Sequence, residues 1–364
     1  MFRITGKNTR PRFSRNEWLM IGGSFALTVL AGILAAVQAN AVLLFLVAGG
    51  ALALLAALVG EATDKLGAYL GSGATGVLQS ALGNLPELFI GIFALRAGLV
   101  TVVQAALVGS ILGNSLFVLG LAFFVGGLRH GTQRFSSEAP RMIAMLTLLA
   151  VAALAVPTLV HTLHTPAAGH EDGLSIACAV ILLAVFLASI PVSLKGGPTS
   201  LPQEPGKEKA RTWPIWLAIT LLVGAGVGSA FVSDWFVGAL TPAITFLHIS
   251  PTFTGLVIVA LAGNAVENVV GIQFAARNRS DYAISVILNS SLQVALGLIP
   301  VLVLLSLIIG GVHLTLVLPP LLVAALGLAA ILSTVIIYDG ESTWLEGLSL
   351  VGLYGIIAAS FWWG

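Results

Sequence analysis

Long apolar runs dominate this sequence and constrain its fold more than any other feature. A helix needs about 20 mostly apolar residues to cross a bilayer, and about eleven runs reach or approach that length. They lie near 18–37, 40–60, 75–97, 101–126, 138–160, 173–194, 213–233, 251–277, 281–309, 313–337 and 345–363. We interpret the shorter apolar segment 234–250 as an interfacial helix or a continuation of the seventh run. The sequence therefore predicts an all-α integral membrane protein with about 11 transmembrane helices.

The low content of charged residues excludes most other classes of protein. Only 9% of the 364 residues are charged and 58% are hydrophobic, whereas a soluble domain has about 25% charged residues. The same scarcity of charge, with a net charge of +1, argues against a disordered chain, a coiled coil and a nucleic-acid-binding protein. A single cysteine, Cys178, leaves no basis for a disulfide or a cysteine-based zinc site.

The distribution of Lys and Arg predicts the orientation in the membrane, because cytoplasmic loops are enriched in these residues. With a cytoplasmic N-terminus and alternating spans, every basic residue except Arg96 falls on the cytoplasmic side. One missed or extra span would scramble this pattern, so the bias also supports the span count. An odd number of spans places the C-terminus outside.

A sequence motif occurs twice, with a shift of 180 residues. Gly-Asn-Leu-Pro-Glu at 83–87 recurs as Gly-Asn-Ala-Val-Glu at 263–267, and Ser110 matches Ser290. The first copy lies on the third predicted span and the second on the eighth, so the two copies cross the membrane in opposite directions. Such inverted repeats are characteristic of secondary transporters, whose sites lie near the midplane between the repeats.

Two acidic residues, Glu87 and Glu267, are the only ones of 15 that lie well inside apolar spans. A carboxylate at the bilayer centre costs about 2.5–3.5 kcal/mol on insertion scales, so intramembrane acids usually have a function. The alternative is a pair of protonated acids that bond neighbouring helices. That alternative does not explain why the whole Gly-Asn-x-x-Glu context is duplicated.

The residues around the two acids suggest an oxygen-rich cation site. Gly83 and Gly263 favour local unwinding of the helix, and Asn84 and Asn264 lie one turn before each Glu. Further polar groups in apolar runs are Ser110, Ser290, Gln293 and Gln104, each of which either joins the site or holds helices together. Oxygen ligands without Cys or His indicate a hard cation, and Ca²⁺ accepts six to eight oxygens in flexible geometry. Without a cation the two carboxylates would repel each other, so protons are the natural competing ligands.

At these residues the sequence resembles the calcium/cation–proton exchanger (CAX) family of the cation/calcium exchanger superfamily. The resemblance is carried by 76–120, by 255–300 and by the tail segment 339–347. It implies that Glu87 and Glu267 are the paired cation- and proton-binding carboxylates, with Asn84 and Asn264 as further metal ligands. It also implies supporting roles for the remaining site residues, Gly83, Gly263, Ser110, Ser290 and Gln293. Asn268 stands where the family often has His.

The resemblance also implies one extra N-terminal span before two groups of five. We expect residues 1–39 to form a basic cytoplasmic N-terminus and the first span, and 40–194 the first five-helix repeat. Residues 195–212, rich in Pro, Gly and Lys, form a cytoplasmic linker, and 213–364 the second, inverted five-helix repeat.

We therefore expect a secondary antiporter, not an enzyme, that exchanges Ca²⁺ or a related divalent cation for H⁺ across a prokaryotic plasma membrane. Calcium and protons are its expected substrates, with no cofactor and no nucleic-acid partner; homo-oligomerisation is left open. A sodium-coupled calcium exchanger is the closest alternative, but it would need additional central acids. A channel would favour a ring of acids, and an intramembrane enzyme would need a nucleophile or a metal-activated water.

Overall fold

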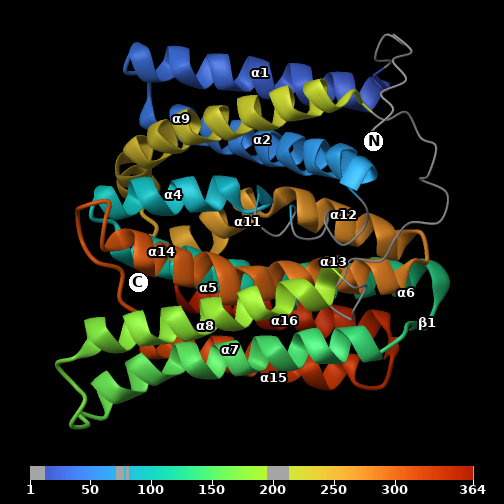
Figure 1. Ribbon diagram of the computed structural model, residues 1–364, viewed down its shortest axis with the longest axis vertical. Helices are drawn as coiled ribbons and strands as arrows, with labels where there is room; N and C mark the ends of the chain where they lie inside the picture. Colours follow the sequence, from blue (N-terminus) through green and yellow to red (C-terminus); the bar gives the residue numbers. More distant parts are fainter. Residues whose placement is uncertain (1–12, 71–77, 79–81, 195–212, 364) are drawn as a thin grey trace, which may run out of the picture.

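The computed structural model describes the chain except for residues 1–12, 71–77, 79–81, 195–212 and 364. Most of the described residues form helices that run side by side (Figure 1). The first half contains α1 (Arg15–Ala36), α2 (Ala41–Leu70), α4 (Leu85–Arg96), α5 (Val100–Leu112), the π-helix η1 (Gly113–Val118), α6 (Leu119–His130), strand β1 (Gln133–Arg134), α7 (Glu138–Thr162) and α8 (Glu171–Leu194). The second half contains α9 (Ile215–Leu247), α10 (Pro251–Phe253), η3 (Thr254–Val259), α11 (Ala260–Gly263), α12 (Ala265–Ala276), α13 (Ser280–Gln293), η4 (Val294–Leu298), α14 (Ile299–Ser306), α15 (Pro320–Ile337), β2 (Glu341–Ser342) and α16 (Trp344–Ser360).

Many of these helices are long and apolar enough to cross a bilayer. Within the described part of the chain eight pass on length and composition, or up to nine if the bent pair 251–263 and 267–276 counts as one span. Their surfaces carry exposed Trp, Phe, Leu and Ile side chains, as expected of helices that face lipid. The mostly helical multi-pass membrane architecture predicted from the sequence is therefore present, with one short two-stranded sheet, β1–β2, in addition.

Two predicted boundaries differ from the structure. α9 runs unbroken from Ile215 to Leu247, so segment 234–250 largely continues the seventh run instead of forming a separate interfacial helix. The prediction of a helix over 313–337 is wrong at its start, because α15 begins only at Pro320 and residues 313–319 are not helical. Gly310 and Gly311 precede this segment with positive φ angles of 73° and 103°, a conformation that few other residues adopt without strain.

Three helices, α1, α2 and α9, pack together at the top of Figure 1. Ser24 on α1 donates a hydrogen bond to the Leu54 carbonyl of α2 at 3.1 Å. Phe45 of α2 stacks on Phe236 of α9, with ring centroids 4.7 Å apart. The remaining helices form the larger body below, and α4, α5, α12 and α13 lie within it.

Several backbone features recur in the second half at a shift of 180 or 181 residues. The turn between α4 and α5 has a positive φ of 75° at Gly98, and the turn between α12 and α13 has 57° at Asn278. The π-helical η1 begins three residues after Ser110, and η4 begins four residues after Ser290. Figure 1 shows α4 and α12 extending from the middle of the molecule toward opposite sides.

Candidate cation site

Both Gly-Asn pairs lie where one helical segment gives way to another. α4 begins at Leu85 and α12 at Ala265, so Asn84 and Asn264 are their N-cap residues. The two asparagines have nearly identical backbone angles, φ −92° and ψ 19° for the first, φ −92° and ψ 17° for the second. In the second copy the flanking helices bend by 66°. Helix breaks thus occur where the sequence predicts them.

The breaks place each glutamate in the first turn of the helix that follows. Glu87 lies in the first turn of α4 and Glu267 in the first turn of α12. The N-terminal turn of a helix presents unpaired N–H groups and the positive end of the helix dipole, which favours negative charge. Pro86 fits this position because its missing N–H would have no partner in the first turn.

The side chain of Glu87 packs directly on Gly263 of the second motif. A Cβ atom placed on Gly263 would lie 2.7 Å from Glu87 Oε1 and 2.8 Å from its Cγ. Glu87 is 9% exposed, and its Oε2 atom is buried without a hydrogen-bond partner among the described residues. The two motifs therefore meet at the first carboxylate.

A chain of polar side chains links the two halves of the molecule beside this contact. Asn264 Nδ2 donates to Ser110 Oγ at 3.0 Å and to the Ala260 carbonyl at 3.0 Å. Ser290 Oγ donates to Asn264 Oδ1 at 3.3 Å, and Asn114 Nδ2 donates to Ser290 Oγ at 2.9 Å. These bonds fix the amide of Asn264, so that its oxygen faces the Ser290 hydroxyl.

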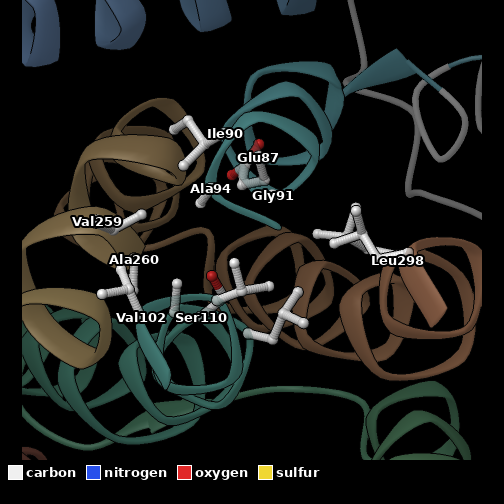
Figure 2. Close-up of a pocket in the computed structure, with 13 residues that line it drawn as sticks. Glu87, Ile90, Gly91, Ala94, Val102, Ser110, Val259, Ala260 and Leu298 are labelled. Atoms are coloured by element: carbon white, nitrogen blue, oxygen red, sulfur yellow. The ribbon is translucent and has the colours of Figure 1, made fainter. Parts of the chain in front are cut away.

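Glu87 and Ser110 both line a small cavity (Figure 2). The space open to the centre of a water molecule is about 20 Å³, and about 10–15 Å³ is enough for one water. Its lining consists of Glu87, Ile90, Gly91, Ala94, Val102, Val103, Ala106, Leu107, Ser110, Val259, Ala260, Leu298 and Leu302. Glu87 and Ser110 supply its only charged or hydroxyl side chains, so a polar occupant would be directed to them.

The donor set fits a hard cation held by few charges. Among the described residues no group of three or more His, Cys, Asp or Glu side chains could hold a metal ion. We call the place where Glu87, Gly263, Asn264, Ser110 and Ser290 meet the crossing. Its polar groups are instead a carboxylate, an amide and two hydroxyls. Oxygen donors of this kind are the ligands that Ca²⁺ accepts.

Comparison with known proteins decides the family. The model of the family described as sodium/calcium exchanger protein matches residues 40–195 and 217–363, which is most of the chain. This chain belongs to that family. The matched ranges contain both Gly-Asn-x-x-Glu motifs and both serines of the crossing.

Individual members of the family resemble the chain over nearly its whole length. A "Ca(2+)/H(+) antiporter" of Synechocystis sp. is 35% identical over 340 residues, covering 87% of this chain and 90% of its own. A "Ca(2+)/H(+) antiporter" of Aphanothece halophytica is 34% identical over 337 residues, covering 87% and 89%. The solved structure of native YfkE has a TM-score of 0.80 and 30% identity, covering 94% of this chain and 99% of its own.

Contacts join most of the residues that the sequence singled out. Glu87 and Gly263 touch, and Asn264, Ser110 and Ser290 are hydrogen bonded. The other predicted residues occupy neighbouring positions along the same helices: Gly83 and Asn84 at the first break, Glu267 half-buried in the first turn of α12, and Gln293 one turn after Ser290.

Sequence reasoning assigned no role to Asn114, which the structure places in the polar chain. Asn114 is 1% exposed and lies in η1, one turn beyond Ser110. The next residue, Ser115, hydrogen bonds Ser291 at 3.2 Å. π-helical turns are rare and frequent at functional sites. The sequence feature that could have identified Asn114 is its pairing with Ser115 inside an apolar run.

Gln104 does not join the polar chain. Its Nε2 donates to the carbonyls of Thr315 and Val317, at 2.9 and 3.0 Å. Of the two roles that the sequence left open for Gln104, the structure therefore favours holding segments together over joining the site.

Proposed function

We propose that this family member exchanges Ca²⁺, or a related divalent cation, for H⁺ by alternating access, with Glu87 and Glu267 as the carboxylates shared by cation and proton. The observation that carries the proposal is the packing of Glu87 on Gly263. It buries a carboxylate between the two motifs, and within the described part of the chain Oε2 has no hydrogen-bond partner. The identity of the two ions, Ca²⁺ and H⁺, is inferred from the names of the antiporter relatives.

Asn84 and Asn264 are proposed as the amide ligands of the cation. The Asn264 oxygen accepts a long hydrogen bond of 3.3 Å from Ser290. A divalent cation attracts an amide oxygen more strongly than a hydroxyl does, so the cation can replace this bond. Ser110, Ser290 and Gln293 support the site, and Gly83 and Gly263 leave room for the side chains and the broken helix.

Protons and the cation compete for the same carboxylate oxygens. Two buried carboxylates without a cation repel each other and lack solvation, so uptake of protons stabilises the unloaded pair. Loading of a divalent cation replaces those protons. This competition couples the two fluxes without a second site, which favours proton coupling over sodium coupling.

The proposed architecture has about 11 spans, with the repeats 40–194 and 213–364 inserted in opposite directions. The 180-residue correspondence of the turns at Gly98 and Asn278 supports this arrangement. The distribution of Lys and Arg supports a cytoplasmic N-terminus and an external C-terminus. In a prokaryotic plasma membrane, this orientation would serve calcium export.

Transport by reconstituted protein tests the proposal. Purified protein in liposomes, with a pH-sensitive dye inside, is given Ca²⁺, Mn²⁺, Mg²⁺ or Na⁺ outside. We expect Ca²⁺ to drive proton movement in the wild type, and Glu87→Gln and Glu267→Gln each to abolish it while the protein stays folded. Glu138→Gln is the matched control, because Glu138 is exposed in the first turn of α7.

Normal calcium-driven proton movement in either site variant would remove that residue from the site. Calcium uptake that requires a sodium gradient and moves no protons would replace the proposal by sodium-coupled exchange.

A further inference from the structure

A buried non-helical segment lies beside the site helices. Residues 313–319 form the last part of the connection from α14 to α15. Within this segment the side chains of Leu314, Leu316 and Leu318 are buried, with less buried residues between them. This alternation indicates an extended backbone. An extended segment inside a helical membrane protein must satisfy its backbone polar groups through side chains.

Hydroxyl groups from three helices satisfy the N–H groups of this segment. The N–H of Leu314 donates to Ser306 Oγ at 3.0 Å, and those of Leu316 and Leu318 donate to Ser175 Oγ and Thr158 Oγ1 at 2.9 Å. The segment is thereby fixed to α14, α8 and α7.

Gln104 fastens the site helix α5 to the same segment. Its amide nitrogen gives both protons to the segment, one to the Thr315 carbonyl and one to the Val317 carbonyl. Val103, Leu107 and Ser110 of α5 line the cavity at Glu87. With 3.6 residues per turn, Gln104 lies about 60° around the helix from Leu107, about 100° from Val103 and about 120° from Ser110. Gln104 therefore anchors a different side of the helix from the one that carries Ser110 toward the cavity.

Gln133 anchors the second site helix pair in the same way. It lies in the loop between α6 and α7, is 2% exposed, and donates to the Ala275 carbonyl at 3.1 Å and to Asn278 Oδ1 at 3.0 Å. In the same loop Ser136 N donates to Asp281 Oδ1 at 2.7 Å. These acceptors belong to the end of α12, the turn and the start of α13, which carry Glu267 and Ser290.

The two attachments are reciprocal. The loop after α6, in the first half, holds the α12–α13 pair of the second half. The loop after α14, in the second half, holds α5 and reaches the end of α4, where a Cβ on Gly311 would lie 3.1 Å from the Leu95 carbonyl. Leu95 and Ala275, whose carbonyls are approached, are 180 residues apart. Each site helix pair is thus fixed by a loop of the opposite half.

We propose that Gln104 and Gln133 are positioning residues for transport: each holds one site-bearing helix pair against a loop of the opposite half and so sets the spacing of the oxygens at the crossing. The inference rests on the proposed cation site. A neutral amide suits the role because its two N–H groups serve two acceptors, whereas a buried cation would cost several kcal/mol. An apolar residue would leave the acceptors unsatisfied.

The test uses Gln104→Met and Gln133→Met, which keep the length of the side chain and remove its donors. Gln273→Met is the control, because Gln273 is exposed on α12. For each purified protein we measure the apparent Ca²⁺ affinity and maximal rate in dye-loaded liposomes, direct Ca²⁺ binding in detergent, and thermal stability. We expect Gln104→Met and Gln133→Met each to bind Ca²⁺ about tenfold more weakly, which corresponds to about 1.4 kcal/mol, and the control to match the wild type.

Wild-type Ca²⁺ affinity in folded Gln104→Met and Gln133→Met would overturn the proposal, even if both variants melt at a lower temperature, because a purely structural role predicts that result. If Gln104→Met does not fold, Gln104→Asn, which keeps the amide but is one methylene too short, carries the same expectation. If Glu87→Gln is inactive while Gln104→Met and Gln133→Met behave like the wild type, only the positioning role of the two glutamines is refuted. If Glu87→Gln is active, the proposed cation site itself is refuted.

Discussion

Replacing Gly263 by Ala tests the contact on which the site is built. The new Cβ would lie 2.7 Å from Glu87 Oε1, 2.8 Å from Cγ and 2.9 Å from Cδ, whereas ordinary van der Waals contact begins at 3.4 Å. The shortest contact falls short by 0.7 Å, so the whole carboxylate end of Glu87 must move. Ca²⁺–oxygen distances vary over only about 0.3 Å, from about 2.3 to 2.6 Å.

This displacement should weaken cation binding more than it weakens the fold. Loss of one charged ligand contact is worth about 1.5–3 kcal/mol, or roughly a 10- to 100-fold loss of apparent Ca²⁺ affinity. Glu87 can move into the adjoining cavity, and Ala is a better helix former than Gly by about 1 kcal/mol, so the melting temperature should change little.

The measurement is a Ca²⁺ titration of proton movement in liposomes, paired with a thermal melt of the same protein. Gly224→Ala is the matched control, since nothing lies within 4 Å of a Cβ at that helical position. A folded Gly263→Ala protein with wild-type Ca²⁺ affinity would show that Glu87 does not act from its place on Gly263.

Three further outcomes are expected. Acidifying the cation-loading side from about pH 8.5 to about pH 6 should weaken the apparent Ca²⁺ affinity competitively, because protons occupy the same carboxylate oxygens; an unchanged affinity in the dye assay would exclude a shared site. Thr158→Val should lower the free energy of unfolding by about 1–3 kcal/mol, because it orphans the Leu318 N–H and the Leu316 carbonyl; an unchanged melting temperature would contradict this. Gly109→Ala should prevent recovery of folded protein, because its Cβ would overlap the Leu256 carbonyl oxygen; a normal yield by gel filtration would show that α5 and η3 can separate.

The sequence predicted those features that depend on local composition and on the repeat. Gly and Asn are poor helix formers, so their duplicated pairs marked the breaks before Glu87 and Glu267. Segment 313–319 was predicted as helix because its apolar composition suits either conformation. What favours the extended form is a set of hydroxyls on distant helices, such as Thr158 and Ser175, and no local pattern reveals them. The role of Gln104 was undecided for the same reason, since its acceptors lie 211 and 213 residues away.

The extended segment also has a consequence for the order of assembly during synthesis. Its side-chain partners, Gln104, Thr158, Ser175 and Ser306, all precede it in the chain. When residues 313–319 are synthesised, the helices that carry their hydrogen-bond partners have therefore already been made. The backbone of the segment can leave water and bond to these partners at once. The loop containing Gln133 is in the opposite situation, because its acceptors at Ala275 and Asn278 emerge more than a hundred residues later. The side chain of Gln133, which is buried in the folded protein, must therefore bond to water until the second half of the chain has been synthesised.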